Sequence, residues 1–317
     1  MSPLGEPIGL PLEHGAVVTV GTFDGVHRGH QDVLATLVRR AAEHSLPSVV
    51  VTFDPHPLEV VNPAAAPPLL TLTNEKLAMF AQSGVSYVAV LPFTPRLAAL
   101  DAEQFVDDVL LGRFALRELL VGHDHGFGRG RLGDIEVLRQ LGRRRGFQVT
   151  VLPPVHTPDG HAISSTAIRR AVAGGDLARA AMGLGRPYSI SGRIVHGDQR
   201  GRTIGYPTLN LEPLPDRKLL PPDGVYAVRV QLPAGEYGGM LNLGPRPTVG
   251  DFHRRIETHV FDATGDWYGA HVRLDFVGRL RGTRPFASLG ALKAQLAEDE
   301  AQARVALATA RPAAPLS

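Results

Sequence analysis

The feature that most constrains the fold is a change in the sequence pattern near Arg186. Before this residue, short apolar runs alternate with helical patterns, whereas beyond it strand patterns follow one another with only turns between them. Apolar strands separated by helices are typical of a parallel sheet covered on both faces, and closely spaced strands are typical of an antiparallel barrel or sandwich. A chain of 317 residues is also long enough for about two domains.

The first half predicts an α/β doubly wound, Rossmann-like domain. The strands are expected at Ala16–Val20, Pro47–Phe53, Ser86–Phe93, Glu118–Gly122 and Phe147–Val155. Helical patterns cover Asn74–Ser83, Ala102–Ala115 and Asp134–Arg145, and a further helix begins near His27 with Val33, Leu34, Leu37, Val38 and Ala41 on one face. Asp101 and Gln104 are expected to form a capping box.

The second half predicts a small antiparallel β-barrel domain with a C-terminal helix. Strand patterns lie within Tyr188–Gly197, Tyr206–Leu211, Gly224–Leu232, Tyr237–Gly244, Arg255–Asp262 and His271–Leu280. A helix is expected from about Ser288, with Leu289, Leu292 and Leu296 on one stripe. We expect domains at 1–185 and 186–307, followed by a flexible tail at 308–317.

Composition limits the class of protein. The formal charge is only +2, which gives little reason to expect a nucleic acid as partner. The chain has no cysteine, no basic and apolar leader, and no apolar run of the ~20 residues that span a bilayer. We therefore expect a cytoplasmic protein that does not bind membranes, as a monomer or weak homo-oligomer. The lysines, Lys76, Lys218 and Lys293, all lack a Walker context.

The segment Gly21–His30, GTFDGVHRGH, lies where the first strand meets the first helix. In a doubly wound sheet, ligands bind at the carboxyl ends of the strands. Glycines let the backbone approach a phosphate, and the helix N-terminus favours an anion. His27 and His30 would lie on one helix face and suit the charge that develops on an α-phosphate. A glycine-rich turn without a ligand, or a zinc site built on the two histidines, are the alternatives.

The whole segment resembles the GxFDGxHxGH signature of the FMN adenylyltransferase (FAD synthetase) module, which is related to the HIGH-type nucleotidylyltransferases. The segments TFDPHP (Thr52–Pro57) and VGHDHGFGRGRLGD (Val121–Asp134) extend this resemblance, although His125 stands where an aromatic residue is usual. The resemblance implies that His27 and His30 are catalytic. It implies ATP binding by Gly21, Phe23, Asp24, Gly29 and His30, and a flavin or nucleotide loop containing Asp54, His56, Asp124 and Phe127.

A third segment, ISSTAIR (Ile163–Arg169), resembles the second nucleotidylyltransferase motif, in which hydroxyl groups and an arginine hold the β- and γ-phosphates. It implies ATP binding by Ser164, Ser165, Thr166 and Arg169. Physically, the three hydroxyl residues would also make an ordinary N-cap for the next helix.

The run HGDQRGRTIGYPTLNL (His196–Leu211) places glycines between two predicted strands. Thr208 and Asn210 are alternate residues of a strand, so they share a face and form a plausible oxygen pair for Mg²⁺. A simple glycine-rich turn is the alternative. The run resembles the GRxLGFPTAN signature of riboflavin kinase, with the bulkier Leu209 for alanine. It implies that Gly201, Arg202, Gly205, Thr208 and Asn210 bind ATP, with Thr208 and Asn210 as metal ligands.

Two later segments keep the resemblance to riboflavin kinase. NLGPRPTVG (Asn242–Gly250) is similar to NxGxRPTF, with Val249 for phenylalanine, and RIETHVFD (Arg255–Asp262) aligns Glu257 with the catalytic glutamate of that family. Phosphorylation of a primary alcohol needs a base or an orienting carboxylate near the hydroxyl. Without the surrounding motifs, Glu257 would be interpreted as a strand glutamate facing solvent.

The resemblance runs from about Gly15 to Ala303 and implies a bifunctional riboflavin kinase/FAD synthetase. Such an enzyme uses Mg²⁺ and ATP to convert riboflavin into FMN and FMN into FAD. One alternative is a nucleotidylyltransferase for another substrate, with the second half as a binding module. A second alternative, a non-enzymatic RNA-binding protein, is disfavoured by the small charge and by the lack of aromatic-rich strands.

Overall fold

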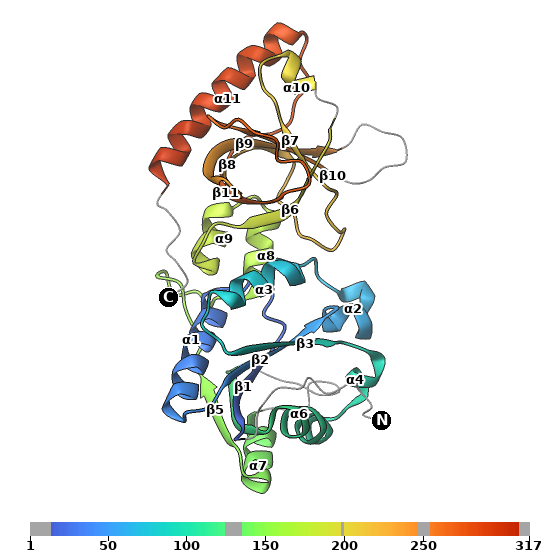
Figure 1. Cartoon of the computed structure of the whole chain (residues 1–317), viewed down its shortest axis with the longest axis vertical. Coiled ribbons are helices and arrows are strands. Elements are labelled where there is room, and N and C mark those ends of the chain that lie inside the picture. Colours follow the sequence, from blue (N-terminus) through green and yellow to red (C-terminus); the bar gives the residue numbers. More distant parts are fainter. Residues whose placement is uncertain (1–13, 124–134, 198–199, 246–253, 311–317) are drawn as a thin grey trace. The chain divides into compact units, whose positions relative to one another are not determined.

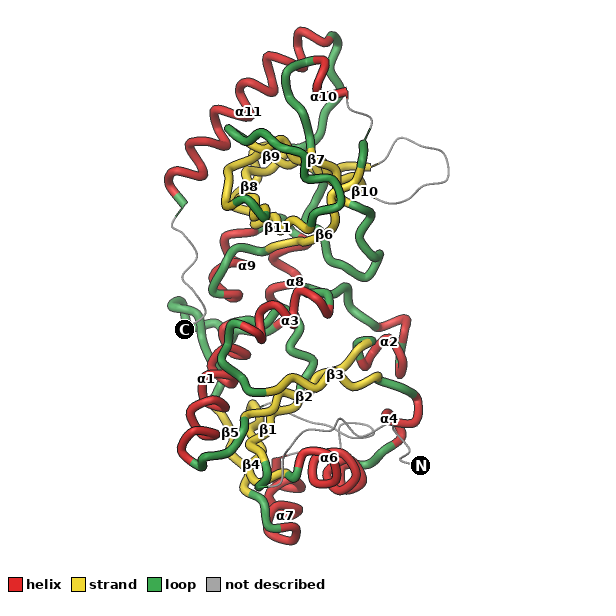
Figure 2. Tube along the Cα trace, in the orientation of Figure 1, coloured by secondary structure: helices red, strands yellow, loops and turns green. Residues whose placement is uncertain are grey.

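The computed structural model describes residues 14–123, 135–197, 200–245 and 254–310 (Figures 1 and 2). Contacts divide these residues into two compact units. The first unit contains residues 14–67 and 72–163, and the second contains residues 68–71 and 164–310. This division describes contacts within the folded chain. The predicted domain border between residues 185 and 186 stays a prediction.

The first unit is built on a parallel sheet whose order is β3-β2-β1-β4-β5. Its strands are β1 (Ala16–Val20), β2 (Ser48–Asp54), β3 (Tyr87–Pro92), β4 (Leu116–Gly122) and β5 (Gln148–Leu152). All five strand predictions are confirmed, with ends shifted by a few residues. The chain proceeds outward from β1 to β3 and then returns to β4 beside β1, so the strand order reverses between β1 and β4. That reversal point is where a doubly wound sheet binds its ligand.

Helices cover both faces of this sheet (Figure 1). They are α1 (Arg28–Glu43), α2 (Pro57–Val61), η1 (Pro63–Ala65), α3 (Thr73–Ala81), α4 (Pro95–Ala99), α5 (Ala102–Gln104), η2 (Phe105–Leu111), α6 (Gly112–Phe114) and α7 (Ile135–Arg145). The predicted helix at Ala102–Ala115 is helical, but its middle part, η2, is a π-helix. The predicted capping box is confirmed, since Asp101 accepts from the Gln104 N–H at 2.8 Å and Gln104 accepts from the Asp101 N–H at 3.0 Å.

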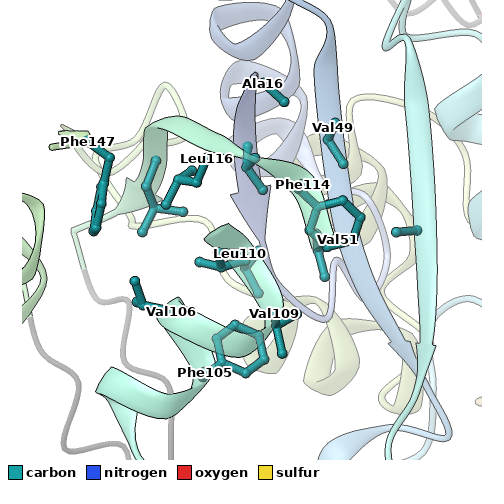
Figure 3. Packing of buried hydrophobic residues seen from close by; sticks show 14 of the residues in the cluster. Ala16, Val49, Val51, Phe105, Val106, Val109, Leu110, Phe114, Leu116 and Phe147 are labelled. Atoms are coloured by element: carbon teal, nitrogen blue, oxygen red, sulfur yellow. The ribbon is translucent and has the colours of Figure 1, made fainter. Parts of the chain in front are cut away.

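The core of the first unit consists of two apolar clusters, one on each face of the sheet. Ala16, Val18 and Val20 of β1 belong to the cluster that also holds η2 and α7 side chains, shown in Figure 3. Val17 instead joins the cluster formed by α1 and α3. Alternate residues of one strand thus face opposite layers, which explains why β1 is buried throughout and apolar except at Thr19, whose hydroxyl donates to the Leu120 carbonyl at 3.0 Å.

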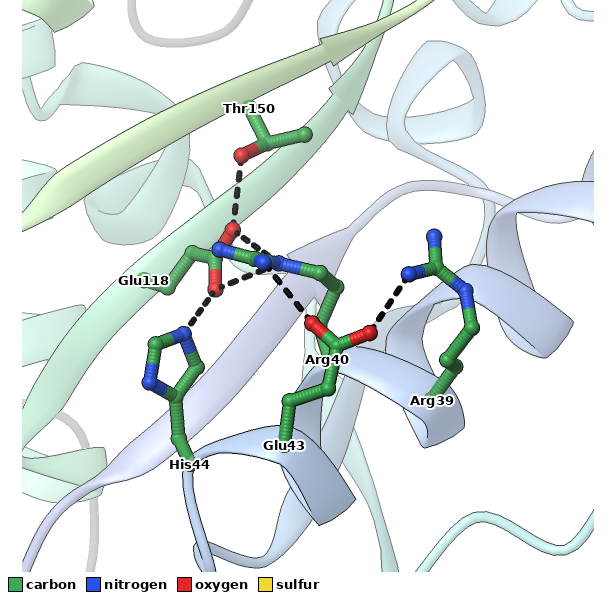
Figure 4. A network of polar contacts seen from close by, with 6 residues as sticks. All are labelled: Arg39, Arg40, Glu43, His44, Glu118 and Thr150. Atoms are coloured by element: carbon green, nitrogen blue, oxygen red, sulfur yellow. Dashed lines mark hydrogen bonds and ion pairs between the residues drawn. The ribbon is translucent and has the colours of Figure 1, made fainter.

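At the carboxyl end of α1, a buried carboxylate joins the helix to the sheet (Figure 4). Glu118 of β4 is only 1% exposed. It accepts hydrogen bonds from Arg40 Nε at 3.0 Å and from Thr150 Oγ1 at 2.6 Å, and His44 Nε2 lies 3.2 Å away. Hydrogen bonding to Glu118 raises the pKa of Arg40 further above its usual range. These contacts set the direction of α1, whose other end carries His27.

The second unit is a closed antiparallel barrel in the order β10-β7-β6-β11-β8-β9, with helices beside it. Its strands are β6 (Ser189–Val195), β7 (Leu209–Leu211), β8 (Gly224–Leu232), β9 (Gly235–Pro245), β10 (Arg254–Val260) and β11 (His271–Arg281). Its helices are α8 (Ser165–Ala173), α9 (Leu177–Leu184), α10 (Arg200–Thr203) and α11 (Leu289–Thr309). The predicted barrel and C-terminal helix are confirmed.

The C-terminal helix attaches to the barrel through apolar and polar side chains. Of the predicted leucine stripe, Leu292 and Leu296 are half-buried, and Leu296 packs against the barrel core. Leu289 is 59% exposed, whereas α11 buries Gln295, Asp299 and Ala303. Asp299 accepts from Arg281 of β11 at 2.8 and 2.7 Å, and Gln295 donates to the same carboxylate at 2.8 Å. A satisfied ion pair is therefore added to the apolar contacts of Leu296, Ala303 and Leu307, because buried polar groups need partners.

We expect Glu118→Gln to destabilise the first unit by about 3 kcal/mol, because it leaves Arg40 beside a buried group that no longer balances its charge. Urea unfolding of the full chain, followed by circular dichroism, measures this change. The matched control is Glu43→Gln, which removes a carboxylate from the exposed side of Arg40. Such exposed pairs contribute little. Equal loss of stability in the two variants would contradict the role given to Glu118.

Candidate active sites

The segment Gly21–His30, named the nucleotide loop after the ATP binding that its sequence predicts, leaves the sheet at the carboxyl end of β1, beside the reversal point. Gly21 still pairs with the sheet, donating to the Val51 carbonyl at 3.0 Å. Beyond it the backbone is left-handed at Phe23 (φ 48°), Gly25 (φ 83°) and Val26 (φ 38°). This conformation is unusual for any residue other than glycine and is strained for a β-branched one, so the rest of the fold must hold it in place.

Buried side chains hold the nucleotide loop. Phe23 and Val26 both belong to the core cluster under α1 and α3, and the Phe23 ring meets Phe80 edge-on with centroids 5.6 Å apart. The Val26 N–H donates to the Phe23 carbonyl at 3.0 Å, and Gln31 Nε2 donates to the Val26 carbonyl at 2.9 Å. The loop is thus a fixed turn rather than a flexible one.

The two predicted catalytic histidines lie together at the N-terminus of α1. His27 is the N-cap, and its Nδ1 accepts the backbone N–H of His30 at 3.3 Å. The two rings stack with centroids 3.6 Å apart. Gly29 allows this packing, since a Cβ there would lie 3.3 Å from the His27 ring. Because Nδ1 of His27 is an acceptor, neutral His27 carries its proton on Nε2. The Nε2–H of neutral His27 is therefore the ring donor that remains for other contacts.

The remaining predicted residues of the first unit are placed as follows. Asp24 is buried within the loop, and Asp54 ends β2 at the same edge of the sheet. His56 caps α2, where its Nδ1 accepts the Leu58 N–H at 3.2 Å. Asp124 and Phe127 lie outside the described residues, as does the unusual His125.

The hydroxyl motif falls in the second unit. Ser164 is the N-cap of α8, and its Oγ accepts the Ala167 N–H at 3.2 Å, which is the ordinary capping role. Ser165 begins the helix and Thr166 is exposed. Arg169 Nε donates to the Pro68 carbonyl at 3.0 Å. The capping interpretation is confirmed for Ser164, and phosphate binding by these four residues stays a prediction.

The second candidate site is a row of polar residues across neighbouring barrel strands. Glu257 of β10 is the register partner of Asn210 on β7 and of Asn242 on β9. Register partners in an antiparallel sheet share a face. Ile256 and Thr258, the neighbours of Glu257, are buried, whereas the Glu257 side chain is partly exposed. The row therefore lies on the outer face of the barrel.

Asn210 is buried beneath the loop that follows β6, although it lies on this outer face. It is 6% exposed, and a Cβ at Gly197 would lie 2.2 Å from its amide nitrogen. Further along the same loop, a Cβ at Gly201 would lie 2.1 Å from the Tyr206 carbonyl oxygen, and Gly205 has φ 88°. Gly197 is thus needed for close backbone approach to Asn210, Gly201 for close approach to the Tyr206 backbone, and Gly205 for a left-handed backbone conformation. Leu209 pairs with Thr258, and strand alternation turns it to the face opposite Asn210.

Charged and aromatic groups surround the row. Arg255 Nε lies 3.5 Å from Glu257 Oε1, and His259 Nδ1 lies 2.7 Å from the Pro207 carbonyl, next to the half-buried Thr208. Arg202 is exposed in α10. Burial raises the pKa of Tyr206, so its phenol is neutral at physiological pH.

The sequence patterns do not single out several residues near the two sites. Asn242 belongs to the motif NLGPRPTVG, but its place opposite Glu257 follows only once the strands are paired. The stacked pair His196 and Tyr268, with centroids 3.7 Å apart, joins segments that are remote in sequence. Lys76 of α3 donates from Nζ to the Thr22 carbonyl of the nucleotide loop at 3.0 Å, and its one signal in the sequence is that lysine is rare in this arginine-rich chain.

Among the residues that the structure describes, no cluster of three or more His, Cys, Asp or Glu side chains could hold a metal ion. A zinc site at His27 and His30 therefore gains no support. Within the same residues, no helix has both the length and the apolar character required to cross a bilayer.

Both halves of the chain match known families. Residues 10–167 match the FAD synthetase family model, and residues 184–307 match the riboflavin kinase model. A bifunctional riboflavin kinase/FMN adenylyltransferase from Escherichia coli strain K12 is 44% identical over 95% of this chain and 96% of its own length. The protein of the same description from Pseudomonas fluorescens is 41% identical over 93% of this chain and 94% of its own length.

A solved structure is also similar over nearly the whole chain. It is described as a macrolide-efflux protein from Streptococcus pneumoniae, with a TM-score of 0.83 and 34% identity over 94% of this chain and 95% of its own. The family models and the curated relatives agree on one assignment. The chain belongs to the family of bifunctional riboflavin kinases/FMN adenylyltransferases.

Proposed function

We infer that this protein catalyses two successive reactions of flavin cofactor synthesis. The second unit transfers the terminal phosphoryl group of ATP to riboflavin and makes FMN, and the N-terminal half transfers the AMP part of ATP to FMN and makes FAD, with release of pyrophosphate. The observation that carries this proposal is the match of both family models, in order, on a chain similar from end to end to bifunctional relatives.

The adenylylation needs positioning and charge neutralisation more than covalent chemistry. The phosphate of FMN attacks the α-phosphorus of ATP, and pyrophosphate leaves. The nucleotide loop places the N-terminus of α1 at the carboxyl edge of the sheet, where its N–H groups favour an anion. We propose that His27 Nε2 and the His30 ring stabilise the negative charge that develops on the α-phosphate in the transition state.

The other adenylyltransferase residues are assigned by resemblance. Gly21, Phe23, Asp24 and Gly29 shape the ATP site, and Ser164, Ser165, Thr166 and Arg169 hold the outer phosphates. Four further residues are assigned to a separate loop that contacts the flavin or the nucleotide. They are Asp54, His56, Asp124 and Phe127. The support for this assignment is the order of the motifs along the chain and the position of the first motif at the strand reversal.

The kinase reaction needs a carboxylate at the hydroxyl of riboflavin. Glu257 is the charged member of the row on the outer face of the barrel, and Asn210 is its direct neighbour. We propose that Glu257 orients the ribityl hydroxyl and accepts its proton. Gly201, Arg202 and Gly205 belong to the loop that would cover the ATP phosphates.

The residues beside Glu257 fit Mg²⁺. An amide oxygen and a hydroxyl are hard oxygen donors, and protein-bound Mg²⁺ completes its shell with substrate phosphates and water. The close contact between Gly197 and the Asn210 amide fixes one of these donors in place. Thr208 and Asn210 would hold the ion, which neutralises phosphate charge when bound. We further propose cytoplasmic activity as a monomer or weak homo-oligomer, without nucleic acid or membrane, in keeping with a +2 charge and no cysteine.

The purified protein, supplied with riboflavin, ATP and Mg²⁺, is expected to yield FMN and then FAD, resolved by liquid chromatography. His30→Ala should abolish FAD while FMN still forms, because only the adenylylation uses the nucleotide loop. Glu257→Gln should abolish FMN formation, and FAD should still form when FMN is supplied directly.

The same assay separates this function from its alternatives. Impairment of both steps to the same extent by each variant would contradict the division of the two reactions. Salt-dependent retention of RNA without any ATP turnover would instead favour an RNA-binding protein.

Gly197→Ala is expected to lower the rate of riboflavin phosphorylation at least tenfold, because the new methyl group must displace the Asn210 amide. FMN adenylylation should be unchanged. Initial rates of both steps provide the measurement. Gly278→Ala is the matched control, since a methyl group there meets no atom within 4 Å. Normal phosphorylation by Gly197→Ala would show that the position of Asn210 does not matter for the reaction.

A further inference from the structure

A buried lysine lies behind the nucleotide loop. Lys76 of α3 is 7% exposed, and its Nζ donates to the Thr22 carbonyl at 3.0 Å and to Thr52 Oγ1 at 3.3 Å. Thr52, at the end of β2, in turn donates from Oγ1 to the same Thr22 carbonyl at 3.3 Å. One backbone oxygen of the nucleotide loop is therefore held by an ammonium and a hydroxyl, from two different elements.

Lys76 brings a charged donor to the Thr22 carbonyl. The Thr52 hydroxyl already donates to the Thr22 carbonyl, and burial of an ammonium is costly because the ion loses its hydration. Lysine is also rare in this chain, whose basic residues are mostly arginine. A compact ammonium fits a site between α3 and the loop that the planar guanidinium of arginine would fill differently.

The position of Thr22 explains what the contact controls. Gly21 still pairs with β2, and Phe23 already has φ 48°, so the peptide between Thr22 and Phe23 is the first one of the left-handed turn. In a planar trans peptide the C=O and N–H point in opposite directions. Holding the Thr22 oxygen against Lys76 therefore turns the Phe23 N–H to the other side and fixes the plane in which the turn begins.

We propose that Lys76 is a positioning residue for FMN adenylylation, acting through the Thr22 carbonyl. It fixes the start of the turn that delivers His27 and the N-terminus of α1, without touching the substrate itself. This inference rests on the proposed adenylyltransferase function of the nucleotide loop.

The first test is Lys76→Met, which keeps the length of the side chain and removes the donor. The kcat of FMN adenylylation should fall at least tenfold, whereas riboflavin phosphorylation on the same chain should be unchanged. Lys293→Met, at an exposed position of α11, is the control for the loss of one charge and should leave both rates as they are.

A double-mutant cycle tests whether the effect passes through Thr22. Thr52→Val removes the second donor to the same carbonyl and should cause a smaller loss of adenylylation. The combined variant should lose less than the product of the two single losses, because both substitutions act on one group. Independent, multiplicative losses would contradict a shared action on the Thr22 carbonyl.

Chemical rescue separates positioning from simple loss of folding. The chain has no cysteine, so Lys76→Cys provides a single thiol. Alkylation with 2-bromoethylamine in urea forms a C–S bond with loss of bromide and restores an ammonium at the length of lysine. After removal of urea, adenylylation should recover to at least half the rate of wild-type protein treated in parallel. Alkylation with iodoacetamide, which adds a neutral amide, should not restore it.

Several results would overturn the inference. They are unchanged adenylylation in Lys76→Met, equal recovery with the neutral reagent, or no recovery with the amine although the wild-type protein recovers. The proposed function fails in a different way, namely when the wild-type protein itself makes no FAD from FMN and ATP. The two failures are therefore distinguishable in one set of assays.

Discussion

The nucleotide loop depends on a left-handed turn that its own sequence would not keep. Phe23 and Val26 both have positive φ, and the strain is sustained because their side chains are buried under α1 and α3. This turn places His27 at the N-cap of α1. At the other end of that helix, Arg40 is hydrogen-bonded to the buried Glu118. The packing of α1 against the sheet and the position of His27 therefore depend on each other, since both involve the same helix.

The second site uses a different principle. Its polar row is created by strand register alone, because Asn210, Glu257 and Asn242 come from three strands and meet only when the barrel closes. Gly197, in the loop after β6, then lets the backbone lie close to Asn210. The amide and carboxylate side chains of this row are brought together by strand pairing between β7, β10 and β9.

The sequence predicted the fold well where a periodic pattern decides the structure. The strands of both units and the capping box at Asp101 follow from alternation and spacing, and the structure confirms them. The polar part of the buried face of α11 could not be predicted, since Gln295 bonds Asp299 and the Arg281 that pairs with Asp299 is on β11. Likewise, the roles of Lys76 and Asn242 depend on contacts between elements that are far apart in sequence. The motifs predict His27, His30 and Glu257 as catalytic residues. Only the structure shows that Nδ1 of His27 accepts the His30 N–H and caps α1.

The central claim is that one chain carries two sites that take different phosphoryl groups from ATP. Isotopic labelling tests it most directly, by incubation of the protein with riboflavin and ATP labelled with ³²P at either the α- or the γ-position. The account predicts that FMN carries only the γ-label, and that FAD carries one phosphorus from the γ-position and one from the α-position. FAD without the α-label, or FMN without the γ-label, would contradict it.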